Sequence, residues 1–284
     1  MSNKPVKLSL EAFLKKLRSS ARNHTQGLRH YTAMSSFMKM SSSEQVYFSL
    51  LSKSNDCGED ESKRHYMLCF NYEKEENVAL WGIYGVPRNE SIRLTFPHDV
   101  IMDWFDAVKH GELVCYGVEN KSRTIPLKDV CPHVSICDVA YYGNGIFTHK
   151  GKKYLVMRDG QPDNKSQLDS RLTPYAKKWA WSFEQEVRIV LEFDKPVLNS
   201  KGKPFERIAV DFDEPLQALR EGFGEIRLGP WCGRSAETVR KRGFSKANVV
   251  SSEFTDQIKL RTPCSECDRE KQKSCICKYK NTMR

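Results

Sequence analysis

The 284-residue sequence has no continuous apolar run that approaches the roughly 18 residues needed for a membrane-spanning helix. Its N-terminal region also lacks an export signal, because its apolar residues are spaced along one helical face with lysine and arginine between them. No internal repeat and no long low-complexity linker is present. These absences exclude membrane proteins and repeat arrays, and they favour a folded protein that stays in the cytoplasm.

Disulfide bonds are not expected without an export signal, so the ten cysteines are interpreted as thiols or metal ligands. Most of them stand singly among apolar neighbours, as Cys69 and Cys137 do, and we expect these to be small buried side chains. The net charge of +10 favours polyanionic partners, either nucleic acid or an acidic protein. A basic surface that only provides solubility is consistent with the same charge.

Hydrophobic periodicity predicts a mixed α+β fold, because the expected strands outnumber the helices and do not alternate regularly with them. Helices are expected over residues 8–22, 34–40, 79–84, 98–108, 215–223 and 235–244, and within 165–181 with an interruption at Pro174. Strands are expected over residues 28–32, 46–52, 65–72, 90–96, 112–119, 133–142, 152–159, 182–193, 205–212 and 224–232. The strand at 182–193 has the clearest pattern.

Composition divides the chain into an amphipathic segment at 1–27, one main α+β domain at 28–262 and a cysteine- and lysine-rich tail at 263–284. The tail contains Cys264, Cys267, Cys275 and Cys277. Four thiolates complete a tetrahedral structural zinc site, although this short spacing is less usual than that of common zinc modules. The tail is therefore interpreted either as a zinc knuckle or as a flexible segment with reduced thiols.

Two carboxylates lie close together at the start of the clearest strand. Because strand residues two apart point to the same face, Glu184, Glu186 and Arg188 are expected to share one face. Adjacent carboxylates repel each other, and burial would add a desolvation cost. Such a pair belongs on an exposed face or at a site that uses the charge. Taken alone, the pattern favours an exposed face with Arg188 as the counter-ion.

Four motifs in a fixed order change this interpretation. The sequence resembles the ADP-ribosyltransferase superfamily, in particular a group of bacterial proteins that includes RNA-modifying toxins of phage-defence toxin–antitoxin modules. The resemblance covers about residues 28–230 and rests on Arg29-His30-Tyr31-Thr32, Leu80-Trp81-Gly82-Ile83-Tyr84, Trp181-Ser182-Phe183-Glu184-Gln185-Glu186-Val187-Arg188 and Glu225-Ile226-Arg227-Leu228-Gly229-Pro230. It implies a mainly antiparallel β core with flanking helices.

The resemblance also implies NAD as the co-substrate and a role for several residues of these motifs. His30 would bind NAD together with Tyr31 and Thr32, and Tyr31 or Tyr84 would stack on nicotinamide. Glu186 would be the catalytic carboxylate, and Glu184 would handle the acceptor. The Ser-Thr-Ser element of the arginine-modifying branch is not found, so the acceptor stays open. RNA is the leading expectation, a protein acceptor is the alternative, and an antitoxin would be a further partner.

These roles agree with the chemistry of the reaction. Cleavage of the bond between nicotinamide and ribose builds positive charge on the sugar, which a fixed carboxylate stabilises. A second carboxylate on the same face can accept the proton of the incoming nucleophile. Whether Trp81 and Tyr84 line the pocket or only fill the core is left open, because aromatic residues at helical spacing fit both.

Two other functions remain in view. One is a non-catalytic nucleic-acid-binding protein that uses the zinc tail and the basic helix at 235–243. The other is a nuclease in which His30, Glu184 and Glu186 surround a metal ion. The first predicts salt-sensitive binding that survives the loss of Glu186, and the second predicts dependence on a divalent metal.

Overall fold

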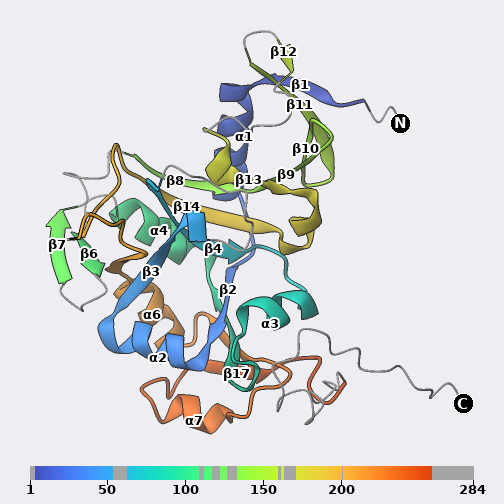
Figure 1. The fold of residues 1–284 in the computed structure, drawn as a ribbon. Coiled ribbons are helices and arrows are strands. Elements are labelled where there is room, and N and C mark those ends of the chain that lie inside the picture. The colour runs from blue at the N-terminus through green and yellow to red at the C-terminus, as the bar shows by residue number, and fades with distance from the viewer. Residues whose placement is uncertain are drawn as a thin grey trace, which may run out of the picture.

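Two β-sheets, one of 11 strands and one of six, form the framework of the chain in the computed structural model (Figure 1). The structure describes residues 4–53, 63–108, 112–116, 122–126, 133–158, 161–162, 171–199 and 201–257. The large sheet consists of β2 (Leu28–Ala33), β3 (Gln45–Leu50), β4 (His65–Asn71), β5 (Ser91–Phe96), β6 (Glu112–Tyr116), β7 (Ser122–Pro126), β8 (His133–Asp138), β14 (Glu186–Glu192), β15 (Arg207–Asp211), β16 (Glu225–Leu228) and β17 (Asn248–Ser251). The small sheet consists of β1 (Val6–Ser9), β9 (Ala140–Gly143), β10 (Ile146–His149), β11 (Lys152–Arg158), β12 (Gln161–Pro162) and β13 (Ala176–Lys178).

Helices flank both sheets. The α-helices are α1 (Leu10–Arg22), α2 (Met34–Ser43), α3 (Val78–Tyr84), α4 (His98–Val108), α6 (Asp213–Arg220) and α7 (Ala236–Arg240). The 3₁₀ helices are η1 (Leu51–Lys53), η2 (Arg88–Glu90), η3 (Thr173–Tyr175) and η4 (Trp179–Glu184). Within the described ranges, no helix has both the length and the apolar composition that crossing a membrane requires.

Most neighbouring strands run antiparallel. The parallel pairs are β1 with β11, β9 with β13 and β16 with β17. The predicted mixed α+β class, with mainly antiparallel sheets and flanking helices, is therefore confirmed.

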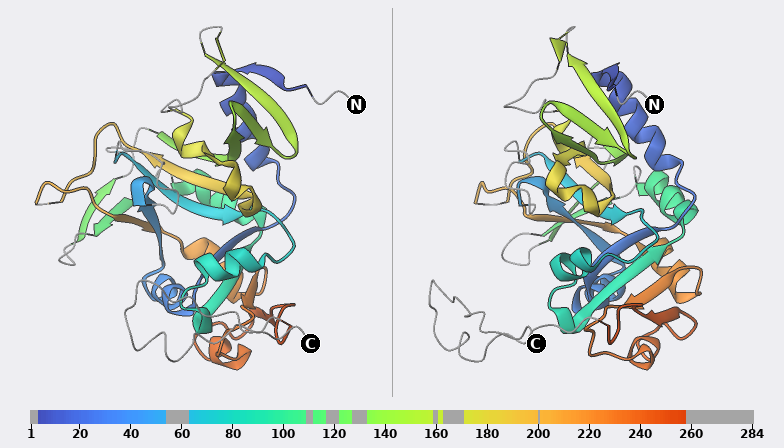
Figure 2. Two further views of the ribbon diagram at one scale, coloured as in Figure 1. Left: turned by 45° about the vertical axis from the view of Figure 1, so that its right-hand side comes forward. Right: turned by 90° about the vertical axis from the view of Figure 1, so that its right-hand side faces the viewer.

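Helix α1 covers the small sheet, which lies above the large sheet in both views of Figure 2. The Oγ of Ser9 accepts the N–H of Ala12 at 3.2 Å, an N-cap contact that stabilises a helix by about 1 kcal/mol. Apolar residues at helical spacing pack against Phe147 and Tyr154, among them Leu10, Phe13, Leu14 and Leu17. The helix predicted at 8–22 and its cap are confirmed, but the preceding residues form β1 rather than the first helical turn.

Strand β14 lies between the two apolar cores. Because its side chains alternate, Val187, Ile189 and Leu191 enter the core of the large sheet. Val190 points the other way, into the core under α1. Arg188 lies on this second face and is fully buried. The strand that carries the carboxylate motif is thus covered on both sides.

The large sheet forks at β4. Strand β14 pairs with β4 along its whole length, from Glu186 opposite Asn71 to Glu192 opposite His65. On the opposite edge of β4, β2 pairs only through Arg29 and Asn71, and β3 pairs only near the other end of the strand. Strand β2 pairs with β5 along its whole length, from Leu28 to Ala33, but it leaves β4 after this single residue pair, so a wedge opens between β2 and β4.

Several element predictions are wrong between residues 171 and 193. Instead of an α-helix interrupted at Pro174, residues 171–181 form η3, the short strand β13 and the start of η4. The strand predicted at 182–193 begins only at Glu186, because η4 continues through Glu184.

The strand predicted at 133–142 is divided at Val139 into β8 and β9, which belong to different sheets. Strands β7 and β10 were not predicted.

Candidate active site

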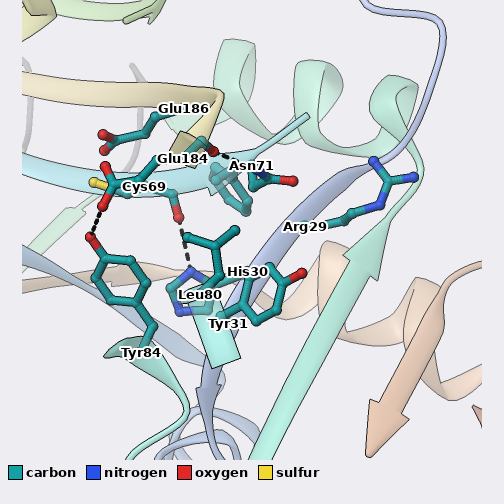
Figure 3. A pocket seen from close by; sticks show the side chains of 10 residues that line it. Arg29, His30, Tyr31, Cys69, Asn71, Leu80, Tyr84, Glu184 and Glu186 are labelled. Atoms are coloured by element: carbon teal, nitrogen blue, oxygen red, sulfur yellow. Dashed lines mark hydrogen bonds between the residues drawn. The ribbon is translucent and has the colours of Figure 1, made fainter. Parts of the chain in front are cut away.

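A pocket lies in the wedge between β2 and β4 (Figure 3). Its cavity has a volume of about 70 Å³ and is partly open to solvent. The residues that line it are Arg29, His30, Tyr31, Cys69, Phe70, Asn71, Leu80, Tyr84, Glu184 and Glu186. The fold thus brings together five of the predicted site residues from β2, α3, η4 and β14. Thr32, the sixth, is not among the lining residues.

The side chain of His30 bridges β2 and β4 at the fork. Its Nδ1 donates a hydrogen bond to the carbonyl oxygen of Cys69 at 3.0 Å, where a backbone ladder would otherwise continue. Burial lowers the pKa of His30, although the Cys69 carbonyl favours the protonated ring. A neutral ring that donates through Nδ1 keeps a lone pair on Nε2, which is able to accept a hydrogen bond from a ligand hydroxyl.

The two aromatic residues of the predicted α3 motif have different positions. Trp81 is fully buried, and its Nε1 donates to Glu76 at 2.9 Å, so it fills the core. Its ring meets the ring of Tyr31 edge to face at 4.8 Å. Tyr84, at the end of α3, lines the pocket and donates its hydroxyl to Glu184 at 2.5 Å. Trp81 therefore belongs to the core, whereas Tyr84 lines the pocket.

Helix α3 is fixed to the segment that carries Glu184. Asn77 caps the helix by accepting the N–H groups of Ala79 and Leu80. The Nδ2 of Asn77 also donates to the carbonyl oxygen of Phe183 at 3.0 Å. The position of Tyr84 relative to Glu184 is consequently set by backbone contacts as well as by its own hydroxyl.

Glu184 and Glu186 reach the same pocket by a route other than strand alternation. Glu184 ends η4, and Gln185 adopts a left-handed conformation with φ of 44°. The expectation that both carboxylates share a strand face is therefore wrong, although Glu186 and Arg188 do share one. The exposed face that the pattern alone favoured is also wrong, because Glu184 is 2% and Glu186 is 5% exposed.

The side chains of Asn71, Tyr72 and Tyr141 hold the turn between the two glutamates. Asn71 donates its side-chain amide to the Glu184 carbonyl, and Tyr72 donates its hydroxyl to the Gln185 side chain. The N–H of Glu186 donates to the hydroxyl of Tyr141 at 3.0 Å. With several partners, the left-handed residue is maintained at a cost that is typically about 1–3 kcal/mol for a non-glycine residue.

Two buried cations neutralise the carboxylates. Arg188 Nε lies 2.9 Å from Glu186 Oε1, so Arg188 is a counter-ion, but on a buried rather than an exposed face. Lys177 was not predicted, and its Nζ lies 2.6 Å from Glu184 Oε2 and 3.3 Å from Glu186 Oε2. Both cations are buried, with Lys177 3% exposed. Two carboxylates and two cations thus form a compact buried cluster.

The two carboxylates differ in their proton affinity. Burial and the charge of Glu186 raise the pKa of Glu184 above its usual range, against the opposing charge of Lys177. Burial also acts to raise the pKa of Glu186, but the charges of Arg188 and Lys177 outweigh it and lower the pKa to about 2. Glu186 is therefore a fixed anion, whereas Glu184 is the carboxylate that exchanges a proton more readily.

Cys69 lies in the pocket rather than in an inert part of the core. Burial and the charge of Glu186 raise the pKa of its thiol well above its usual range. The thiol therefore stays protonated beside Glu186. Its interpretation as a simple buried apolar side chain is wrong, whereas Cys137 is fully buried and fits that interpretation.

A second polar cluster surrounds Asp138, which is fully buried at the end of β8. Its carboxylate lies 2.7 Å from His24 Nε2, 2.8 Å from His149 Nε2 and 3.2 Å from Lys150 Nζ. The ring of His24 stacks on Tyr72 at 4.5 Å, and Tyr72 contacts Gln185 between the two glutamates. This cluster connects the N-terminal segment to the turn that positions the pocket carboxylates.

Metal ligation finds no support at the pocket. Among the described residues, no group of three or more His, Cys, Asp or Glu side chains is arranged to hold a metal ion. The ammonium group of Lys177 lies between the two carboxylates, where the nuclease alternative would need the ion. The tail cysteines Cys264, Cys267, Cys275 and Cys277 lie outside the described residues.

Lys177, Asn71 and Arg29 were not predicted as site residues from the sequence. Arg29 donates to the carbonyl oxygens of Gly27 and Tyr72 and so supports the end of the wedge opposite Tyr84 (Figure 3). Arg29 lies within a motif that was recognised. Asn71 ends a strand that was predicted, and a polar residue there is an available signal. Lys177 carried no signal, because its neighbourhood was predicted to be helical.

Comparison of the chain with protein-family models, with curated proteins and with solved structures returned no match in any of the three.

Proposed function

We propose that the chain is an NAD-dependent ADP-ribosyltransferase with its active site in the wedge between β2 and β4. The observation that carries the proposal is the convergence of His30, Tyr84, Glu184 and Glu186 on one cavity. These residues lie up to 156 positions apart in the sequence (from 30 to 186) and belong to three of the four motifs. An ADP-ribosyltransferase type of β core is part of the same proposal.

Each pocket residue has a role that suits its chemistry. Glu186, held as an anion by Arg188 and Lys177, stabilises the positive charge that develops on ribose as nicotinamide leaves. His30 accepts a hydrogen bond from a hydroxyl of NAD through Nε2. Tyr31 and Tyr84 provide aromatic surface for the nicotinamide end. Glu184 accepts the proton of the incoming nucleophile.

The cavity determines how much of NAD is enclosed. Its volume of about 70 Å³ is below the ~150 Å³ of a protein cavity that holds benzene. The cavity therefore encloses no more than part of the nicotinamide end, and the rest of the dinucleotide lies outside it. The hydrogen bond between Tyr84 and Glu184 joins α3 to η4 at this cavity.

The acceptor in this proposal is RNA, and specifically mRNA, with a protein side chain as the alternative. The net charge of +10 supports a polyanionic acceptor. The resemblance of the motifs to toxins of phage-defence modules supports a toxin or defence effector whose activity is restrained by an antitoxin partner. Structural zinc in the tail belongs to the same set of proposals.

Transfer of label from NAD tests the function. NAD labelled on its adenylate phosphate is incubated with the purified chain, with RNA in one reaction and bulk protein in another. We expect label on RNA with the unmodified chain and with Glu214→Gln, a control at an exposed glutamate of α6. Glu186→Gln should lower labelling at least 100-fold, since the anion that stabilises the transition state is lost. Label that is independent of Glu186, or no label from folded chain, contradicts the proposal.

A further inference from the structure

Lys177 occupies a position that links the two pocket carboxylates. It lies on β13, which pairs with β9 beside the pocket, and its Nζ contacts Glu184 at 2.6 Å and Glu186 at 3.3 Å. The side chain is 3% exposed, and the ring of Trp181 lies 5.1 Å from Nζ. A lysine ammonium buried to this extent is costly unless nearby anions compensate it, so its place between two carboxylates is specific.

The two carboxylates do not share their cations equally. Arg188 lies two residues after Glu186 on the same strand and contacts both Glu186 oxygens, at 2.9 and 3.3 Å. Glu184 lies before the left-handed turn, and its side chain meets Lys177 and the hydroxyl of Tyr84. Removing Lys177 would thus leave Glu186 with Arg188, but would leave Glu184 beside a second carboxylate without its cation.

We propose that Lys177 is a positioning residue that holds Glu184 ionised and oriented, so that Glu184 rather than Glu186 takes the proton of the acceptor. The inference rests on the proposed function and extends it to a residue that none of the four motifs contains. Lys177 contacts the carboxylate that reacts and acts through it.

In the proposed step, the acceptor replaces nicotinamide on ribose and gives its proton to Glu184. A lone pair of the acceptor oxygen or nitrogen forms a bond to the anomeric carbon of ribose, while the bond from that carbon to nicotinamide breaks and its electron pair leaves with nicotinamide. The acceptor proton moves to Glu184, which later releases it to solvent. Glu186 stays ionised throughout because Arg188 remains beside it.

Other groups that face Glu184 must be considered in any pH measurement. Tyr84 faces it from α3, Cys69 from β4, His30 from β2, and Glu186 from β14. Tyr84 and Cys69 stay protonated through neutral pH, because burial raises the pKa of each. His30 also changes its protonation state below neutral pH, because burial lowers its pKa. The variant Glu184→Gln is therefore needed to assign the acid limb of a pH profile to Glu184 rather than to His30.

The pH dependence of transfer tests the proposal. The kcat/KM for label transfer is measured against pH for the unmodified chain and for Lys177→Met, Lys177→Arg and Lys178→Met. Lys178 is the exposed neighbour and serves as the matched control. We expect Lys177→Met to move the acid limb upward by about one pH unit or more, which is a tenfold loss at a pH on that limb. Lys177→Arg should keep the acid limb close to its position in the unmodified chain, because the cation is retained. Lys178→Met should leave the limb unchanged.

A double variant separates this role from a structural one. If Lys177 acts through Glu184, adding Lys177→Met to Glu184→Gln should lower kcat by less than twofold beyond Glu184→Gln alone. The double variant also lacks the uncompensated carboxylate, so it remains usable if Lys177→Met alone fails to fold. Equal losses in both backgrounds, or an acid limb that does not move in Lys177→Met, overturn the proposal.

A measurement without turnover distinguishes the failure of this inference from the failure of the proposed function. The carboxyl carbon of Glu184 is titrated by ¹³C NMR, with Glu184→Gln for assignment. A pKa that rises in Lys177→Met supports the inference about Lys177 even if no nicotinamide is released by any form. An unchanged titration contradicts it even if the chain is shown to be a transferase.

Discussion

His30 Nδ1 lies 3.0 Å from the carbonyl oxygen of Cys69, across the fork at which β2 leaves β4. The hydrogen bond substitutes for a strand ladder and fixes the ring at the pocket. Because the carbonyl can only accept, the contact determines which ring nitrogen carries the proton. The geometry of the sheet therefore presents Nε2 as an acceptor.

Replacing His30 should affect the use of NAD more than the fold. We expect His30→Ala to lower kcat/KM for NAD at least tenfold, since one hydrogen bond to the substrate is lost and the wedge loses its closing contact. Steady-state rates of nicotinamide release measure the effect. An unchanged kcat/KM would remove His30 from the binding site.

The sign of the pH effect at His30 follows from its environment. Burial lowers the pKa of His30, so the neutral form is present at neutral pH, and protonation at lower pH removes the Nε2 acceptor. The KM for NAD should thus rise as the pH falls, and His30→Ala should lose this rise.

Arg188 should be essential for stability. It is fully buried and contacts Glu186 at 2.9 Å, and its Nη1 donates to the carbonyl oxygen of Pro174 at 3.0 Å. Arg188→Met leaves a buried carboxylate with less compensation, which typically costs about 3–5 kcal/mol of unfolding free energy. Urea denaturation measures the loss. The double variant Arg188→Met/Glu186→Gln should recover part of it, and an equal loss in both would show that the ion pair is not the cause.

Features of the site that depend on residues close together in the sequence were predicted, whereas features that depend on distant residues were not. The shared strand face of Glu186 and Arg188 was predicted, because residues two apart in a strand point the same way regardless of the rest of the fold. The left-handed conformation of Gln185 was not predicted. It depends on Asn71, Tyr72 and Tyr141, which approach from other strands.

The same reason explains the errors around Lys177. A helix was predicted within residues 165–181, but Ala176–Lys178 pair in parallel with β9 of the small sheet as β13, and no local pattern encodes this pairing. Helix α1 and its cap at Ser9 were predicted, since the N-cap contact spans only three residues. Strand β10 was missed because it has four residues and packs through its hairpin with β11.

Asp138 should make the stability of the chain sensitive to acid. Burial opposes ionisation, but hydrogen bonds from His149 and His24 outweigh it and hold the pKa of Asp138 well below its usual range. A depressed carboxyl pKa stabilises the fold above the unfolded-state pKa of about 4, and this contribution is lost as the pH falls through the folded-state pKa.

The substitution Asp138→Asn isolates this contribution. At pH 7 we expect it to lower the unfolding free energy by about 3–5 kcal/mol, as removal of one partner of a buried ion pair does. The difference between Asp138→Asn and the unmodified chain should shrink below about pH 4. Thermal denaturation as a function of pH checks both expectations, and a difference that is constant over the whole range contradicts them.

The Cys69 thiol should react slowly with alkylating agents. Burial and the charge of Glu186 raise its pKa, so little thiolate is present at neutral pH. In Glu186→Gln the neighbouring charge is gone, and we expect faster modification by iodoacetamide, measured at the Cys69 peptide by mass spectrometry. Cys232, which is partly exposed near the end of β16, serves as an internal reference that should not change. Equal rates at Cys69 in the two forms would show that Glu186 does not act on the thiol.

Release of nicotinamide from NAD by the purified chain is the most direct test of the central claim, that the pocket between β2 and β4 cleaves the nicotinamide–ribose bond by means of Glu186. Our account predicts steady release by the unmodified chain and by Glu214→Gln, and a loss of at least 100-fold in Glu186→Gln, with all three shown to be folded by circular dichroism and free of any inhibitor. Equal release by Glu186→Gln, or no release by any of the three in the presence of RNA and protein acceptors, would contradict it.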